Sequence, residues 1–458
     1  MSTNIQKTRL QKALFGGSFY FSSFPFYSGL SFNSYTTRLT VLSSVNSSEK
    51  KLSPLVGGSS AQIVAFVVGF FTGLSSGASV TIAQFFGAKD SRSANKGLHT
   101  AYAIAAFGGL ILTVSGIILT PFLLEMMNTP ADIVADSAVY LRIYFAGIIF
   151  VLIYNMGSAI LRATGDSKRP LYYLIVCCII NIVLDVLFVI VFHMGVMGVA
   201  VATLIAQAVS AVLVTLKLMR SEGILKLSVK QIRFHGSILK MQLKLGLPTG
   251  FEAILFSITN IAIQSAVNTF GTDTTAAWSA YGKLDAIFWM VSTAFGIAIT
   301  TFVGQNYGAG KMDRVRKSTR VCLLMDFIVS AVLVVFLIAA RFLLFRLFTN
   351  DSHVIEIGCD MLVLITPWYI VYVFIEVIAG ALRGVGNVVV PVAITLLGVC
   401  VLRIAWLAAM LKISPTISAI ILSYPVTWVI TALAFIIYYI YITHKTIAGS
   451  SKKHVPKL

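Results

Sequence analysis

Residues 170–193 read PLYYLIVCCIINIVLDVLFVIVFH, an apolar run in which Asp185 is the only side chain charged at pH 7. The run has the length that an α-helix needs to cross the hydrocarbon core of a bilayer, about 20 residues. Only helices and closed barrels can span hydrocarbon, because the backbone finds no water there to bond with. Barrel strands would show short alternating segments, which this run lacks. The stretch therefore predicts a transmembrane helix.

The composition extends this reading to the whole chain. Of its 458 residues, 57% are hydrophobic and 11% are charged, whereas a soluble domain has about 25% charged residues. The net charge of +18 would suggest nucleic acid in a soluble protein, but here the basic residues sit in short loops. The five cysteines and six histidines show neither metal-ligand nor catalytic spacing, and no GxxxxGK[ST] loop is present. We expect no enzyme activity, no cofactor and no nucleic-acid partner.

Ten further apolar segments accompany the first. The predicted spans lie at about 61–86, 98–121, 136–161, 170–193, 196–217, 244–268, 278–304, 319–342, 358–382, 389–411 and 415–442. Their connections alternate between basic ones and ones poor in Lys and Arg. The positive-inside rule places the basic set, including the tail 443–458, in the cytoplasm. We expect a multi-pass protein of the cell inner membrane with a cytoplasmic carboxy terminus.

Two motifs recur at one offset. AQFFGA at 83–88 returns as GQNYGA at 304–309, and the Leu-Arg pair at 161–162 returns at 382–383. The offsets agree, since 305 − 84 = 221 and 382 − 161 = 221. Both copies of each motif fall in basic connections, so the repeat is parallel, with its axis along the membrane normal.

The repeat predicts two six-helix lobes related by a pseudo-two-fold axis, and so an all-α membrane protein with twelve spans. The expected parts are an amino-terminal lobe at 56–217, a cytoplasmic connecting loop at 218–243, a carboxy-terminal lobe at 244–442 and the basic tail. The span at 244–268 demands a partner near 23–47, where the sequence is polar. We interpret residues from about 12 to 55 as an out-of-frame reading of the gene; the alternatives are a divergent amino terminus or a real mutation.

The strings at 303–311 and 380–391 resemble those of the MATE (multidrug and toxic compound extrusion) family of the MOP flippase superfamily, over about residues 56–445 and not over 1–55. The resemblance implies twelve spans in two lobes around a cavity, and alternating access that exchanges Na⁺ or H⁺ for small organic, often cationic, compounds. We expect a monomer. The alternatives are a lipid-linked oligosaccharide flippase, which would favour several cavity Arg and Lys residues, a non-transporting scaffold or receptor, and a nonfunctional transporter that lacks a span.

One candidate site lies in the first half. Asn181 and Asp185 lie four residues apart and so share a helix face. A carboxylate and an amide oxygen can replace part of the hydration shell of Na⁺, or the carboxylate can carry a proton. The family resemblance implies a cation site of Asp185, Asn181, Thr203 and Asn155, with no metal other than possible Na⁺. The alternative is that Asn181 and Asp185 only hydrogen-bond between helices.

A second set lies in the second half. Glu376, Asp285, Glu252 and Arg403 all fall within apolar spans, where a charged group costs at least ~2.5–3.5 kcal/mol. Glu376 is the repeat partner of Asn155 (376 − 155 = 221) and is expected to attract a cationic substrate or carry a proton. Arg403 is predicted to neutralise one of the acids. Glu252 follows Pro248 near an expected helix break, either as a cavity residue or as a polar residue at the membrane edge.

Overall fold

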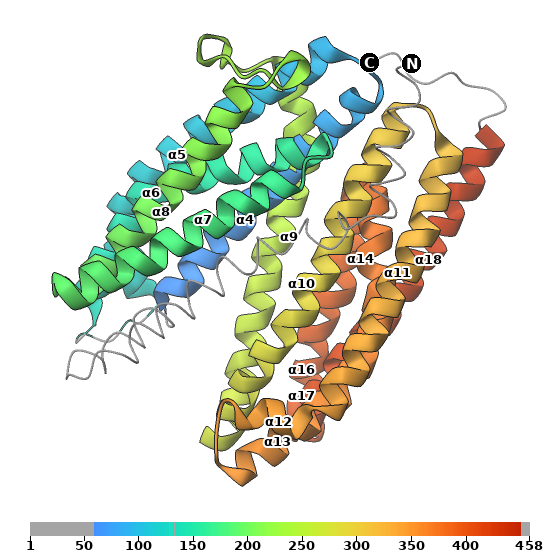
Figure 1. Ribbon diagram of the computed structural model, residues 1–458. Helices are drawn as coiled ribbons and strands as arrows, with labels where there is room; N and C mark the ends of the chain where they lie inside the picture. The colour runs from blue at the N-terminus through green and yellow to red at the C-terminus, as the bar shows by residue number, and fades with distance from the viewer. Residues whose placement is uncertain (1–58, 128, 130, 132, 450–458) are drawn as a thin grey trace. The chain divides into compact units, whose positions relative to one another are not determined.

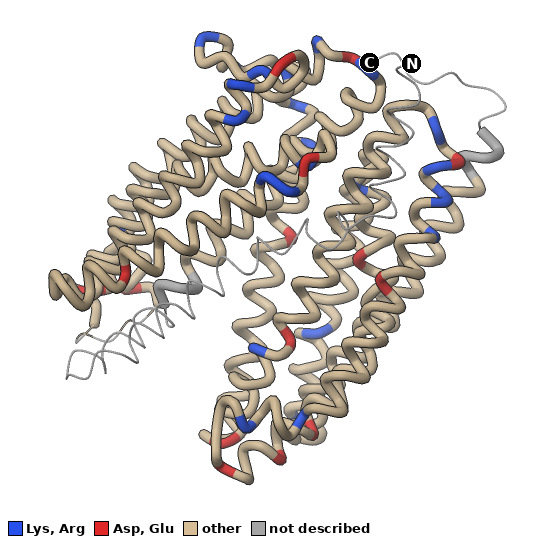
Figure 2. The backbone as a smooth tube through the Cα atoms, viewed as in Figure 1, with Lys and Arg blue, Asp and Glu red and all other residues tan. Residues whose placement is uncertain are grey.

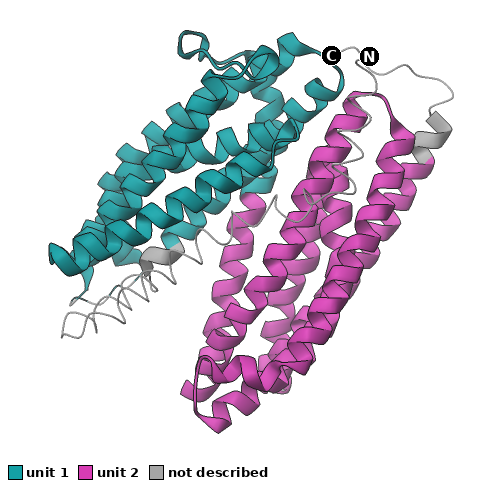
Figure 3. Cartoon of the chain, viewed as in Figure 1, with its two compact units in different colours: residues 1–250 teal, residues 251–458 magenta. Residues whose placement is uncertain are grey.

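A computed structural model describes residues 59–449 apart from 128, 130 and 132. In this part of the chain eleven helices are long and apolar enough to cross a membrane. They coincide with the eleven predicted spans and confirm the all-α membrane fold. The segment 12–55, which we interpreted as an out-of-frame reading, lies outside the described residues. By its contacts the chain divides into two units, Met1–Gly250 and Phe251–Leu458, coloured separately in Figure 3. The division falls inside one helix, a few residues after the predicted boundary at 244.

In the first unit α6 is the central helix, packed against α4, α5 and α8, while α7 packs on α8 (Figure 1). The helices of this unit are α4 (Ser59–Gly87), α5 (Ser91–Met126), α6 (Val134–Ala163), α7 (Lys168–Val186), η1 (Leu187–Val191), α8 (Gly195–Met219), η2 (Gly223–Leu225), η3 (Val229–Gln231) and the start of α9 (Gly236–Asn268). The segment η1 continues α7 as a π-helix, a local widening that is frequent at functional sites.

In the second unit α10 packs against α11, α13 and α14, and α14 packs on α18. The helices are α10 (Thr272–Gly308), α11 (Met312–Ala339), α12 (Arg341–Arg346), α13 (Ser352–Ile365), η4 (Thr366–Trp368), α14 (Tyr369–Gly384), α15 (Val389–Thr395), η5 (Leu396–Val401), α16 (Leu402–Ile413), α17 (Ile417–Ile421) and α18 (Ser423–Gly449). The one π-helical segment described here, η5, ends two residues before Arg403.

The helix ends repeat at the offset found in the sequence. The ends of α4 and α10 differ by 308 − 87 = 221, and the starts of α5 and α11 by 312 − 91 = 221. The same offset separates the ends of α6 and α14 (384 − 163) and the starts of α7 and α15 (389 − 168). The repeated motifs therefore mark equivalent turns between equivalent helices.

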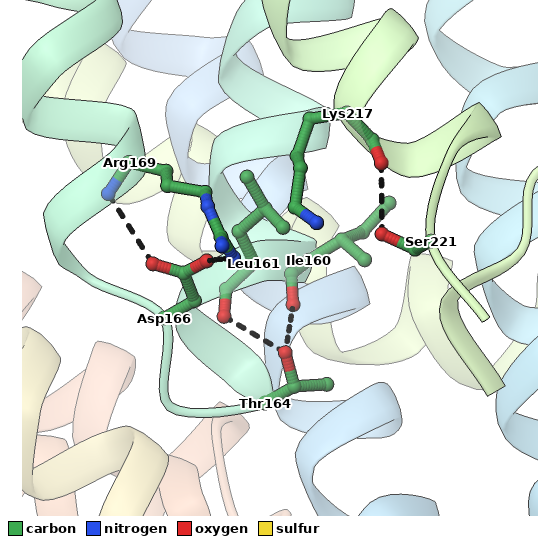
Figure 4. Close-up of polar contacts among 7 residues, drawn as sticks. All are labelled: Ile160, Leu161, Thr164, Asp166, Arg169, Lys217 and Ser221. Atoms are coloured by element: carbon green, nitrogen blue, oxygen red, sulfur yellow. Dashed lines mark hydrogen bonds and ion pairs between the residues drawn. The ribbon is translucent and has the colours of Figure 1, made fainter. Parts of the chain in front are cut away.

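Two glycines show what one of these motifs does. Gly165 and Gly386 have φ values of 94° and 88°, a conformation that side-chain-bearing residues rarely adopt. Each helix ends with the same pair of backbone hydrogen bonds. Gly165 N donates to Arg162 O and Asp166 N donates to Leu161 O. In the second repeat Gly386 N donates to Arg383 O and Asn387 N donates to Leu382 O. This is the Schellman arrangement, which satisfies the last carbonyls of a helix. Figure 4 shows the residues on either side of Gly165: Thr164, whose hydroxyl donates to Leu161 O, and Asp166, whose carboxylate accepts a bond from Arg169 Nη1 at 2.5 Å.

The turn after α4 is built in the same way, with a different residue at its left-handed position. Lys89 has a φ of 59°, and its repeat partner Gly310 has a φ of 69°. Asp90 then caps α5 by accepting a bond from Ser93 N at 3.0 Å. The hydrogen bonds from Ser93 hold the pKa of the Asp90 carboxyl below its usual value.

Glycines bring the backbones of α4 and α9 together within the first unit. A Cβ placed on Gly77 would lie 2.3 Å from the Gln242 carbonyl oxygen, and one on Gly73 would lie 2.3 Å from the Gly250 nitrogen. On α9, Gly246 and Gly250 make the reciprocal contacts with Leu74 and Phe70. Both pairs are spaced by four residues, the small-xxx-small pattern that lets membrane helices approach closely.

The segment between α8 and α9 is bound to the start of α5 and is shorter than the predicted loop 218–243, because α9 begins at Gly236. Asn95 Nδ2 donates to the carbonyls of Ile224 and Lys226 at 3.2 and 3.1 Å. His99, which is 1% exposed, bonds through Nδ1 to Asn95 O at 2.8 Å, so its Nε2 is the acceptor for Ser228 N at 3.0 Å.

The exposed faces of the helices are apolar. On α5 the exposed side chains at 107, 110, 111, 114 and 118 recur at helical spacing and are all large and hydrophobic, as expected of a surface that faces lipid. Lys and Arg gather at the helix ends (Figure 2). In the second unit the charge asymmetry is weaker than the sequence pattern indicated, because Arg341, Arg346 and Lys412 lie at the ends that also carry Asp273 and Asp351.

Candidate functional site

Asp185 is a buried acid of the first unit. It lies in the last turn of α7, just before the π-helical segment, and its side chain is fully buried. Neither of its carboxylate oxygens has a hydrogen-bond partner among the described residues. Burying a carboxylate without partners is costly, so such a group takes up a proton or a cation. Because Asp185 belongs to an apolar helix, this arrangement points to a binding role.

Asn181 and Thr203 lie beside each other at the α7–α8 contact. The distance from Asn181 Nδ2 to Thr203 Oγ1 is 3.5 Å, which is long for a hydrogen bond. Thr203 Oγ1 donates to Val199 O at 2.9 Å, and besides the long bond from Asn181 it has a second lone pair that can bind a cation. Asn181 stands one turn before Asp185 on the same face. Carboxylate, amide and hydroxyl oxygens of this kind are the ligands that hard cations prefer.

Asn155 stands apart from this pair. It lies on α6, directly after Tyr154, whose hydroxyl donates to Pro170 O at 2.9 Å. Asn155 is therefore level with the start of α7, whereas Asn181 lies eleven residues further along, about 16 Å at 1.5 Å per residue. The structure thus brings Asn181, Asp185 and Thr203 to one region and leaves Asn155, which is also buried, nearer the other end of α7.

In the second unit Glu376 is paired with Arg383. Arg383 Nη2 donates to Glu376 Oε1 at 3.0 Å, and each side chain is less than one-fifth exposed. The two residues are seven apart on α14, two turns along one face. The sequence placed Arg383 in a basic connection and missed this pair, although the spacing i, i+7 on an amphipathic helix is a signal for it.

Arg403 makes no direct ion pair with an acid among the described residues, although it lies within electrostatic range of Asp285, so its predicted neutralising role stays a prediction. Arg403 Nη2 donates to Thr427 Oγ1 at 2.9 Å, and the guanidinium lies over the ring of Tyr424, 4.0 Å from its centroid. The two ion pairs within the described residues are Arg169–Asp166 and Arg383–Glu376. Arg403 is instead held by an aromatic face and a hydroxyl, a stable arrangement for a weakly hydrated guanidinium.

Asp285 is held by three donors. Trp289 Nε1 donates to Asp285 Oδ2 at 2.7 Å, and Tyr281 and Tyr369 both donate to Oδ1. Tyr369 in turn stacks on Phe288 with ring centroids 3.8 Å apart. The carboxylate is thus fixed inside an aromatic cluster by hydrogen bonds, within electrostatic range of Arg403.

Glu252 lies on α9, half-buried, within electrostatic range of Arg383 and Glu376. The expected helix break at Pro248 is wrong, because α9 runs without interruption from Gly236 to Asn268. A membrane helix tolerates a proline where neighbouring groups satisfy the backbone. Glu252 is therefore on a continuous helix, and like Glu376 it lies within electrostatic range of Arg383.

Sequence reasoning missed one buried acid altogether. Asp326 on α11 is fully buried, and Ser330 Oγ donates to its Oδ1 at 3.1 Å. The signal was available, since a carboxylate in the middle of an apolar span is a functional candidate by default.

Membrane-spanning helices in a parallel repeat, with ionisable groups buried in each unit, are typical of a membrane transporter. The comparisons agree. The MatE family model matches residues 29–187 and 248–407, which is more than half of the chain, and the chain belongs to the MATE family of membrane transporters. The match begins at residue 29, so the prediction that the resemblance is absent before residue 56 is wrong for residues 29–55. As a member of this family the chain is a multi-pass membrane protein that handles small molecules.

Relatives and solved structures are consistent with this. The chain is 30% identical over 341 residues to the probable multidrug resistance protein YoeA of Bacillus subtilis, covering 73% of each chain. It is 28% identical over 350 residues to the probable multidrug resistance protein NorM of Thermotoga maritima, covering 74% of each. The fold is similar to that of a MOP superfamily transporter from Pyrococcus furiosus, with a TM-score of 0.85, 18% identity and coverage of 95% of this chain and 96% of the other.

Proposed function

We propose that the chain is a secondary active multidrug exporter, which moves organic, often cationic compounds out of the cell in exchange for Na⁺ or H⁺. The relatives at 28–30% identity are named as multidrug resistance proteins. The proposal includes a place in the cell inner membrane with the carboxy terminus in the cytoplasm. It also includes a monomer that has no enzyme activity and no nucleic-acid partner.

The observation that carries the proposal is Asp185, which is fully buried in an apolar helix and whose carboxylate oxygens have no hydrogen-bond partner in the described part of the chain. A site of this kind binds a coupling cation, with Asn181 and Thr203 as its polar neighbours. Cation binding can drive alternating access only if the two conformations bind the cation with different affinity. A carboxylate that is desolvated in one conformation and hydrated in the other binds the cation with different affinity in the two conformations.

The flippase alternative has less support. A lipid-linked pyrophosphate needs free cationic side chains, and Arg383 and Arg403 of the second unit already have partners. Arg383 is paired with Glu376, and Arg403 is bound to Thr427 and lies over Tyr424.

The test is export of ethidium from vesicles that hold the purified protein, with a Na⁺ gradient and a pH gradient imposed separately. We expect Asp185→Asn to lower coupled export at least tenfold, because the amide can neither hold a charge nor titrate. The gradient that drives the wild-type protein identifies the coupling ion.

The matched control is Asp136→Asn, which changes an exposed acid in the first turn of α6 of the same unit. It should transport at the wild-type rate. If Asp185→Asn also transports at that rate when normalised to folded protein, Asp185 is not the coupling site.

A further inference from the structure

Asp326 lies where three helices of the second unit meet, since α11 packs against both α10 and α14. Its side chain is completely buried. One carboxylate oxygen, Oδ1, accepts the bond from Ser330, whereas Oδ2 has no partner among the described residues. No cationic side chain is bonded to it. A carboxylate in this setting is stable only when it carries a proton.

A second buried polar group lies on the neighbouring helix α10. Ser292 is fully buried, and its hydroxyl has no hydrogen-bond partner in the described part of the chain. The bond from Cys322 Sγ to Phe295 O at 3.9 Å sets the register of the antiparallel helices α10 and α11. Asp326 lies four residues beyond Cys322 and Ser292 lies three before Phe295, which is about 6 and 4.5 Å in the same direction. The two side chains are therefore level to within about 1.5 Å.

The carboxylate of Glu376, which belongs to α14, contacts α10 one helical turn beyond Ser292. A Cβ placed on Gly296 would stand 2.0 Å from Glu376 Oε1, so this carboxylate rests directly on the α10 backbone. Gly296 is four residues from Ser292, about 6 Å along the axis. Glu376 is also the charged group, outside its own helix, that acts on Asp326 electrostatically.

The same face of α10 continues in the other direction. Positions 285, 289, 292 and 296 recur at the i, i+4, i+7, i+11 spacing of one helical stripe. The stripe carries Asp285, the indole nitrogen of Trp289 that donates to it, the Ser292 hydroxyl, and the Glu376 carboxylate over Gly296. By the register given above, Asp326 on α11 is level with Ser292, the third position of this stripe.

We propose that Asp326 and Ser292 form a proton site that exchanges with Glu376, so that the second unit carries a proton between these two carboxyl groups. The inference rests on the proposed export function and adds to it: it assigns H⁺ as the ion handled by the second unit and names residues to which no role has been given.

The exchange balances with one proton. When it resides on Asp326, Glu376 is an anion and pairs with Arg383, which is the arrangement observed. In the reverse step the O–H bond of Asp326 breaks and an O–H bond forms on Glu376, whose pair with Arg383 is released. In this step the Ser292 hydroxyl, which has no hydrogen-bond partner in the observed arrangement of the described residues, turns to accept the proton from Asp326 and donates its own proton to Glu376. The other titratable groups around the site are Cys322 on α11, Asp285 on α10 and Glu252 on α9.

The first experiment uses the full-length protein in vesicles, with pH-driven ethidium export measured from pH 5 to pH 9 and the carboxyl stretching band followed by infrared difference spectroscopy. Asp326→Asn keeps the shape of the side chain and an acceptor for Ser330. We expect it to lose one protonated-carboxyl band and at least tenfold in export, whereas Asp326→Glu should restore both. The matched control is Asp360→Asn, an exposed acid of α13, which should change neither.

Ser292→Ala guards against a folding defect, because the hydroxyl it removes makes no hydrogen bond that folding could lose. It should keep the thermal stability of the wild type and change the pH profile of export. If Asp326→Asn retains the band, or if Ser292→Ala retains the wild-type pH profile, the proton site is refuted while export itself stands. If the wild-type protein exports nothing under either gradient, the proposed function fails instead.

Discussion

Substituting Gly77 by alanine tests whether the close approach of α4 and α9 stabilises the first unit. The added Cβ would lie 2.3 Å from Gln242 O, 2.5 Å from Gly246 N and 2.8 Å from Gly246 Cα. All three atoms belong to the backbone, so no side chain can rotate away to make room. The two helices must move apart for the methyl group to fit.

The size of the effect follows from these distances. Ordinary contact of a Cβ begins at 3.4 Å, so the backbones have to separate by about 1 Å. A gap of that size forfeits a quarter to a half of the dispersion attraction along the interface, and overpacking of this kind typically costs about 1–3 kcal/mol. For a unit of 150–250 residues each kcal/mol shifts the melting temperature by about 2–4 °C. The expected loss is therefore about 2–12 °C.

Gly282→Ala is the matched control, because a Cβ on Gly282 of α10 meets nothing within 4 Å. Both variants gain the same helix propensity, about 1 kcal/mol over glycine, so the difference between their melting temperatures reports the contact alone. Melting is measured on purified protein in one detergent by tryptophan fluorescence. The reasoning is refuted if Gly77→Ala melts at or above the temperature of Gly282→Ala.

Two further predictions concern charge. Arg383→Gln and Glu376→Gln should each lower the melting temperature, and the double variant should lose less stability than the two single variants lose together. The double-mutant cycle should give a coupling energy of about 0.5–3 kcal/mol. Strict additivity would mean that the observed ion pair is not energetically coupled. Ser318→Cys, near the start of α11 in the basic cluster, should react with an impermeant thiol reagent only after intact cells are permeabilised, because the positive-inside rule places that turn in the cytoplasm. Labelling of sealed cells would contradict the topology.

The sequence predicted the helices and the repeat because both depend on properties that are local. A span needs only length and apolar composition, and the eleven segments met that condition. The turn at Gly165 and Gly386 repeats because a left-handed residue and its two hydrogen bonds are needed wherever a helix ends in this way. At Lys89 the same turn forms without glycine, which shows that the backbone geometry is retained where the residue type is not.

The candidate site was less predictable, because the sequence gives the depth of a residue in the membrane but not its neighbours on other helices. Asn181 and Asp185 share one helix and were recognised from their spacing. The partners of Arg403 are Thr427 and Tyr424 on another helix, and only packing could reveal them. The pair of Glu376 with Arg383 is local and was overlooked because Arg383 was assigned to a loop.

The two repeats keep their turns and diverge in their interiors. Asp326 and Asp285 stand where the first half has Ala105 and Val64, and Asp185 stands where the second half has Trp406 (each pair 221 apart). Each of these acids thus corresponds to an apolar residue at the equivalent position of the other repeat. A duplicated scaffold whose ionisable groups occupy different positions has no structural need for any one of them, since the other repeat forms the same helix without it. We therefore expect these acids to serve proton or cation binding: the Asp185 carboxylate has no partner among the described residues, whereas the carboxylates of the second unit are bonded to Tyr, Trp, Ser and Arg.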